Sequence, residues 1–335
     1  MKVDETHRRW LSHVTGKEVG ESSLIQQLWS GYGACFRARL KGNCDSAMVS
    51  NDNNQHVVVK CVQPPKDMSH PRGWSSRHAH ERKIRSFDVE HYFYTNLQRL
   101  TDENCKTPHC IAHDNIESNS LLVLEDLDGL GFSARATSLS IDQALPVIKW
   151  LAHFHATFLS IKDENVWKEG TYWHLSTRLE EFDAMPDSPL KHAARDISDA
   201  LDNAKFKTLL HGDAKVANFC FTPAFDDCAA VDFQYTGHGV GVKDVAYFIG
   251  SALSKDDQLH GTDTCINYYF SVLRSRLVDT IGRSAFSQLE QEWRRLYSFA
   301  CADFYRFLAG WSPDHWKIND VLEMHSQHAL NQQVK

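Results

Sequence analysis

Three short apolar runs lie close together in the second half of this 335-residue chain, at residues 208–210, 219–221 and 228–231. Apolar runs of this length, separated by turn-forming residues, predict short strands. The polar residues between and after the runs then fall at strand ends and in loops. We therefore expect one small sheet whose edge carries these polar side chains.

Three oxygen-bearing side chains are expected at that edge: Asp213, Asn218 and Asp232. Carboxylate and amide oxygens suit Mg²⁺, which prefers a few hard ligands in a partly hydrated site. Phosphoryl transfer needs a carboxylate beside the acceptor hydroxyl and cations that neutralise developing charge. The spacing predicts Asp213 as the base, Asn218 as one metal ligand and Asp232 as the metal bridge to the phosphates. The alternative is that these residues only build turns.

A glycine pair, Gly31 and Gly33, lies between residues 22–29, whose pattern predicts a helix, and the β-like run 35–40. Glycines in such a place let the backbone approach phosphate groups closely. The alternative is an ordinary turn before a hairpin.

The run 57–62 is strongly β-branched and predicts a buried strand that carries one cation, Lys60. A buried lysine is costly unless it is paired. The α- and β-phosphates of a nucleotide, together with a carboxylate from a neighbouring helix, would supply the pairing. Glu90 is the first candidate, because aromatic residues recur around it at helical spacing, and Glu81 is the second. For both, the alternative is a solvated surface carboxylate.

These motifs together resemble a known family, the kinase-like phosphotransferases of the aminoglycoside phosphotransferase and choline kinase type, and most closely their ecdysteroid-kinase-like branch. The resemblance implies an α+β, two-lobed protein-kinase-like fold, with a small antiparallel-sheet N-lobe and a larger, mostly helical C-lobe. We expect residues 1–128 to form the nucleotide-binding lobe and 129–335 the catalytic and acceptor-binding lobe, with ATP in the cleft between them. The resemblance is carried by Trp29-Ser-Gly-Tyr-Gly33, Val57-Val-Val-Lys60, Glu90, Leu124-Glu-Asp-Leu127, the loop from His211 to Asn218, and Asp244-Val-Ala-Tyr247.

The resemblance also implies roles that the residue types alone do not. Glu125 and Leu127 fall where the family has the hinge between lobes, whose backbone binds adenine. Lys215 departs from the family pattern: it stands where aminoglycoside kinases commonly carry His and matches protein kinases instead, in which it would contact the γ-phosphate during transfer. His211 and Asp244 would support the catalytic loop, although Asp244 alone could equally be a helix N-cap.

The segment after Asp232 indicates the kind of acceptor. Only eleven residues separate it from Asp244, and no Ala-Pro-Glu follows, which leaves little room for the segment on which protein kinases dock peptides. We expect a small hydroxyl-bearing acceptor, with ATP and Mg²⁺. Two alternatives stay open: a protein kinase, favoured by Lys215, and a nucleotide-binding regulatory pseudokinase, favoured by the short glycine loop and by Phe233-Gln234.

The carboxy-terminal third should determine which acceptor is bound. Residues 288–311 predict an aromatic, mostly buried helix, and Asp303 interrupts its apolar pattern. We expect Asp303 to face the acceptor pocket, with a surface or paired carboxylate as the alternative. Trp311, His315 and Trp316 would line the same cavity.

Composition limits the classes of partner. The chain has 42% hydrophobic and 24% charged residues, as soluble globular proteins do, and its net charge of −7 argues against nucleic acid. No eighteen apolar residues run together and the start has no apolar leader core, so we expect a cytoplasmic protein without membrane contact. The oligomeric state stays open.

The segment 64–85 is unusually long for a loop within a compact lobe. It could fold over the nucleotide or form a surface insertion with a short helix.

Overall fold

The structure is a computed structural model, and it forms two compact units, which we call unit 1 and unit 2. Unit 1 comprises Met1–Arg99 with Pro108–Ser133, and unit 2 comprises Leu100–Thr107 with Ala134–Lys335. The residues that the structure describes are 3, 5–28, 31–41, 55–65 and 77–333.

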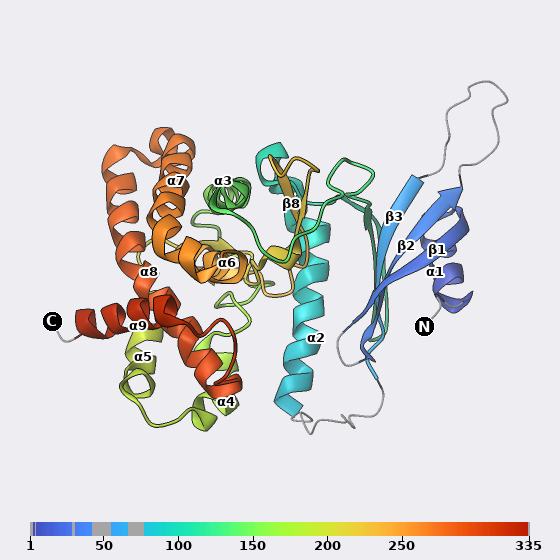
Figure 1. The fold of residues 1–335 in the computed structure, drawn as a ribbon. Helices are drawn as coiled ribbons and strands as arrows, with labels where there is room; N and C mark the ends of the chain where they lie inside the picture. Colours follow the sequence, from blue (N-terminus) through green and yellow to red (C-terminus); the bar gives the residue numbers. More distant parts are fainter. Residues whose placement is uncertain (1–2, 4, 29–30, 42–54, 66–76, 334–335) are drawn as a thin grey trace. The chain divides into compact units, whose positions relative to one another are not determined.

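Unit 1 is built on a five-stranded antiparallel sheet with strand order β1-β2-β3-β5-β4 (Figure 1). Lys60 in β3 lies opposite Cys35 of β2 and Leu122 of β5 in the ladder. The α-helices in the described part of this unit, α1 and α2, lie on opposite faces of the sheet. The bounds are α1 Glu5–Thr15, β1 Glu18–Gln27, β2 Gly33–Lys41, β3 Gln55–Val62, α2 Arg77–Tyr92, β4 Cys110–Ile116 and β5 Asn119–Glu125.

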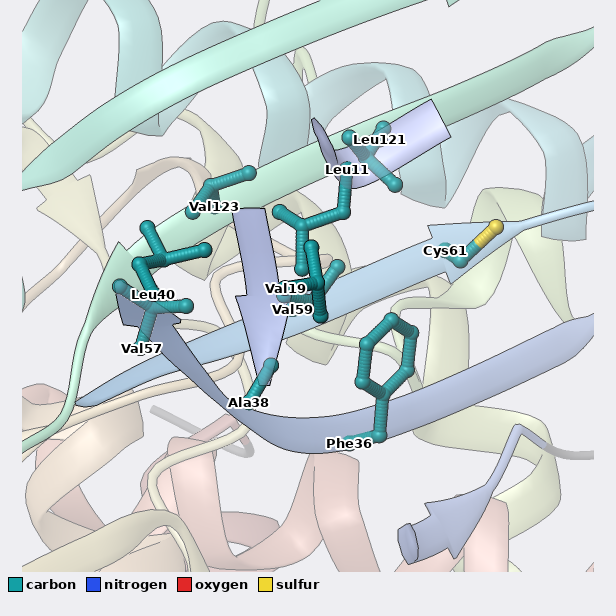
Figure 2. Packing of buried hydrophobic residues seen from close by; sticks show 10 residues of the cluster. All are labelled: Leu11, Val19, Phe36, Ala38, Leu40, Val57, Val59, Cys61, Leu121 and Val123. Atoms are coloured by element: carbon teal, nitrogen blue, oxygen red, sulfur yellow. The ribbon is translucent and has the colours of Figure 1, made fainter. Parts of the chain in front are cut away.

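The core of unit 1 lies between the sheet and α1 (Figure 2). Alternate residues of the central strands point to this side, for example Phe36 of β2, Val59 of β3 and Val123 of β5, and Leu11 of α1 packs on them. Alternation sends Lys60 to the opposite face, where α2 lies. The apolar core and the Lys60 side chain therefore lie on opposite faces of the same sheet.

The helix expected at residues 22–29 is wrong, because Ser22–Gln27 belong to β1, and Trp29 and Ser30 lie outside the described residues. β1 is an edge strand with mostly exposed side chains, so its pattern carries no burial signal. Its ladder with β2 has register shifts at Val19/Ser22 and at Leu24/Gln26. Pairing with β2 overrides the local preference for helix.

Unit 2 is mostly helical, and a few very short strands lie beside α3 (Figure 1). None of the helices in the described ranges is long and apolar enough to cross a membrane. The bounds are α3 Ile141–Thr157, α4 Leu179–Ala184, α5 Pro189–Asp202, β6 Thr208–Leu210, β7 Phe219–Phe221, β8 Cys228–Ala230, β9 Gly237–Gly239, α6 Val242–Ala252, α7 Lys255–Ile281, α8 Arg283–Trp311 and α9 Asp320–Gln333.

The three strands predicted around residues 208–231 are present, but the single sheet expected for them is wrong. β6 pairs with β9, through Leu209 opposite His238, whereas β7 pairs with β8, through Cys220 opposite Ala229. A 3₁₀ turn at Val216–Asn218 lies between β6 and β7, and β7 pairs with the next strand, β8, in a hairpin. The polar residues are therefore held by this loop and not by one sheet edge.

Candidate catalytic site

Asp213 lies in the loop after β6 and has only 7% of its surface exposed. Its Oδ2 accepts hydrogen bonds from Lys215 Nζ at 2.8 Å and from Asn218 Nδ2 at 3.1 Å. Its Oδ1 is buried and accepts no hydrogen bond from the described residues, although the Tyr247 hydroxyl lies close to this carboxylate. The carboxylate is thus fixed through one oxygen while the other keeps its capacity to accept a proton.

His211 supports the loop as a neutral ring. Its Nε2 donates to the carbonyl of Val231 at 3.0 Å, and its Nδ1 accepts from the backbone N–H of Asp213 at 3.2 Å. Complete burial lowers the pKa of His211, against the opposing effect of Asp244, Asp213 and Asp232. One tautomer therefore joins the start of the loop to the strand end before Asp232.

Asp244 fixes the backbone of the same loop from α6. It is fully buried, and it accepts from the backbone N–H of His211 at 2.6 Å and of Gly212 at 3.0 Å. His155 Nε2 donates to it at 3.2 Å. The N-cap of α6 is Gly241, so the N-cap alternative for Asp244 is wrong.

Gly212 allows the chain to turn between β6 and Asp213. Its φ is +81°, and a Cβ at this position would lie 1.9 Å from the carbonyl oxygen of Tyr235. Both the backbone conformation and the lack of space require glycine.

We expect Gly212→Ala to lower the free energy of unfolding by about 2–3 kcal/mol, because it combines a left-handed backbone with a backbone clash. Urea denaturation measures the change. Gly250→Ala is the matched control: a Cβ there meets nothing within 4 Å, and alanine in a helix gains up to about 1 kcal/mol. Equal stability of the two variants would contradict the close packing of Gly212 against Tyr235.

Asp232 follows β8 with φ at +71°, a conformation that is strained for a residue other than glycine. Such strain is commonly found at functional sites. Burial alone would lower the pKa of Lys215, but Asp213 and Asp232 outweigh burial and raise it. Lys215 is therefore a persistent cation that is paired with Asp213 and stabilised by the charge of Asp232.

The side chains of this loop fit a magnesium ion by their chemistry. Asn218 directs its amide nitrogen to the backbone carbonyl of Asp213 at 2.8 Å, which leaves its amide oxygen on the other side for a metal. With the Asp232 carboxylate this gives two hard oxygen ligands, the number that a kinase supplies beside phosphates and water. Among the described residues no group of three or more His, Cys, Asp or Glu forms a metal cluster, and this type of site needs none.

Unit 1 contains the predicted lysine–carboxylate pair. Lys60 Nζ lies 2.8 Å from Glu90 Oε1 and 2.6 Å from Glu90 Oε2, and both residues are buried. The carboxylate beside Lys60 is that of the first candidate, Glu90. Gly31 has φ at +77° and Gly33 at +135°, and a Cβ on Gly33 would lie 2.0 Å from the carbonyl oxygen of Cys61.

The end of β5 and the residues after it are tied to their own unit by hydrogen bonds. The N–H of Glu125 donates to the carbonyl of His109 at 3.0 Å, and Glu125 Oε2 accepts from the N–H of His109 at 3.0 Å. Leu127 is buried, and its carbonyl accepts from Phe132 N at 2.9 Å. Adenine binding by Glu125 and Leu127 stays a prediction. Residues 66–76 of the long segment 64–85 lie outside the described residues.

The geometry of Asp303 favours the alternative of a paired carboxylate. Asp303 is 2% exposed on α8, Arg306 Nη2 donates to its Oδ1 at 2.8 Å, and Lys243 Nζ lies 3.3 Å from its Oδ2. Burial would raise its pKa, but Lys243 and Arg306 outweigh burial and lower it. With both oxygens engaged by cations, Asp303 ties α8 to α6 and is not available to an acceptor.

Sequence reasoning missed an aromatic wall beside Asp213. Tyr172 donates to the hydroxyl of Tyr247 at 3.3 Å, and Lys317 Nζ lies 4.4 Å from the centroid of the Tyr247 ring. Burial, with further contributions from Tyr172 and Asp213, raises the pKa of Tyr247 well above its ordinary value. Tyr247 belongs to a motif that was recognised, but no local pattern marks Tyr172 or Lys317.

The fold is that of kinase-like phosphotransferases. One similar structure is a protein from Ralstonia eutropha assigned as an aminoglycoside phosphotransferase, at 13% identity and TM-score 0.51, covering 98% of this chain and 94% of the other. A second is an amicoumacin kinase solved with AMP-PNP, Ca²⁺ and Ami, at 10% identity and TM-score 0.51, covering 98% and 92%. The small antiparallel sheet and the mostly helical second part confirm the predicted fold class.

The chain belongs to the ecdysteroid kinase-like family, whose model matches residues 32–181 and 167–281. An uncharacterized kinase-like protein of Caenorhabditis elegans is 23% identical over 235 residues, which are 63% of this chain. The match covers 62% of that relative's length. The family predicted from the motifs is thus confirmed.

Proposed function

We propose that this protein is an ATP- and Mg²⁺-dependent small-molecule kinase that transfers the γ-phosphoryl group to an alcohol hydroxyl. The observation that carries the proposal is the Asp213 carboxylate, which is buried, held by Lys215 and Asn218 through Oδ2, and free of hydrogen bonds at Oδ1 within the part of the chain that the structure describes. A carboxylate in this state can accept the proton of an acceptor hydroxyl.

In the proposed reaction the acceptor oxygen forms a bond to the γ-phosphorus of ATP, and the bond from that phosphorus to the bridging oxygen of ADP breaks. The acceptor proton moves to Asp213 Oδ1. Lys215 supplies positive charge next to the oxygen that loses its proton, and Lys60, held by Glu90, would contact the α- and β-phosphates. Magnesium, when bound, would neutralise phosphate charge through the oxygens of Asn218 and Asp232.

A screen of hydroxylated metabolites for ADP release, with ATP and Mg²⁺ present, tests this function. At least one compound should raise ADP release above the level without acceptor, and Asp232→Asn should abolish the increase. Asp226→Asn, in the exposed β7–β8 turn, is the matched control and should keep it.

Two results would overturn the proposal. Nucleotide binding without ADP release for any compound indicates the regulatory pseudokinase. Phosphorylation of generic peptides in place of metabolites indicates the protein kinase.

A further inference from the structure

The cations of the Asp213 loop, of α6 and of the aromatic wall in unit 2 differ in what they are paired with. Lys215 is bound to Asp213 itself, Lys243 is paired with Asp303 at 3.3 Å, and Arg178 is paired with Glu181 at 3.0 Å. For Lys317, no described carboxylate lies within the 4.0 Å of an ion pair. Lys317 is therefore the cation of this group whose charge is available to a ligand.

Lys317 is held by rings in place of carboxylates. Its Nζ lies 4.4 Å from the centroid of Tyr247, 5.7 Å from that of Phe304 and 5.6 Å from that of Trp316. Burial lowers the pKa of Lys317 to about 8, with Asp213 opposing this effect and Lys215 adding to it. The effects of Asp213 and Lys215 on this pKa show that the Lys317 ammonium lies within electrostatic reach of Asp213. Because the ammonium is partly desolvated, an anion that binds to it would gain more electrostatic free energy than at an exposed lysine.

The approach to Lys317 is aromatic. Phe307 and Trp311 stack with centroids 5.5 Å apart, Trp311 lies 5.7 Å from His315, and His315 stacks on Trp316 at 5.8 Å. Trp316 is 66% exposed and Trp311 is 39% exposed, an unusual exposure for such large rings. An apolar or planar ligand body can pack on these faces while a charged group reaches the ammonium.

From this arrangement, and resting on the proposed kinase function, we propose that Lys317 selects the acceptor, and that the acceptor is a hydroxy acid: an alcohol with an apolar body and an anionic group. A cationic amino alcohol is disfavoured for two reasons. Lys317 repels it, and the carboxylate that could have attracted it, Asp303, is already engaged by Lys243 and Arg306. Local charge thus favours an anionic acceptor although the net charge of the chain is −7.

Three probes of equal shape test the proposal: para-(hydroxymethyl)benzoate, para-(hydroxymethyl)benzamide and para-(hydroxymethyl)benzylamine. The kcat/KM of the wild type should be about 10- to 100-fold higher for the benzoate than for the amide, which corresponds to the free energy of one charge-assisted hydrogen bond. The kcat/KM for the amine should be lower than that for the amide. Lys317→Met should remove the preference, and Lys317→Arg should keep most of it. Lys255→Met, which breaks an exposed pair with Asp320, is the control and should change nothing.

Binding of para-methylbenzoate, which has no hydroxyl, separates this inference from the proposed function. Calorimetry should detect it with the wild type but not with Lys317→Met, whose melting temperature should be unchanged or higher. Binding without turnover of any probe would support the anion site and count against the kinase function, which the metabolite screen tests separately. Preference for the amide or amine, a benzoate preference that survives in Lys317→Met, a change in the KM for ATP alone, or no binding and no turnover would each overturn the inference.

Discussion

Asp213→Asn should lower turnover by about 10²–10⁴-fold, the range measured for the removal of a general base, while ATP binding stays nearly intact. Asparagine keeps the shape and an oxygen for Asn218, so the loop should keep its conformation, but it cannot take the proton of the acceptor. Steady-state kinetics give turnover, and calorimetric titration gives nucleotide affinity.

Asp226→Asn provides the matched control, because it removes the same charge from an exposed turn and should leave both quantities unchanged. Turnover of Asp213→Asn equal to that of the wild type would exclude Asp213 as the base. A large loss of ATP affinity in place of turnover would instead assign Asp213 to nucleotide binding.

Asp244→Ala should lower the free energy of unfolding by about 3–5 kcal/mol. The substitution leaves the buried N–H groups of His211 and Gly212 without their acceptor, and each such group costs roughly 1–3 kcal/mol. Turnover should fall as well at temperatures where the variant is folded, because the same bonds fix the backbone next to Asp213. Urea denaturation and kinetics on the folded variant measure the two effects.

Two further variants separate loop bracing from helix capping. Asp244→Ser keeps a side chain that can cap a helix but cannot span both N–H groups, so it should not restore stability. Asp279→Ala removes an exposed carboxylate from α7 and should stay within about 0.5 kcal/mol of the wild type. Full rescue by serine would contradict the bracing role.

The Lys60–Glu90 contact could be predicted because two regular periods constrain it. The strand period puts Lys60 on the face away from the apolar core, and the helix period around Glu90 aims one carboxylate at that face. Because a buried lysine is costly without a counter charge, the two periods together predict that Glu90 pairs with Lys60.

Predictions were wrong where the deciding contacts are distant in the sequence. β1 has mostly exposed residues, so only its ladder with β2 makes Ser22–Gln27 a strand. The pairing of β6 with β9 joins strands that are distant in the sequence, and apolar runs do not encode which strands pair.

The acceptor side shows the same limit. Arg306 lies three residues after Asp303 on α8, and this spacing predicts that the two side chains pair. The contact of Asp303 with Lys243 cannot be predicted from the sequence, because Lys243 lies on another helix. No sequence pattern predicts the position of Lys317, because that position depends on rings of α6 and α8 and on the neighbouring Trp316.

The measurement that tests the central claim most directly is identification of the product by phosphorus NMR and mass spectrometry, after incubation of the wild type with ATP, Mg²⁺ and the best acceptor from the screen. We predict a phosphate monoester on the acceptor hydroxyl, formed in a one-to-one ratio with ADP and absent with Asp213→Asn. ADP accompanied only by inorganic phosphate, or an acceptor recovered without a phosphoryl group, would contradict the assignment of this protein as a small-molecule kinase.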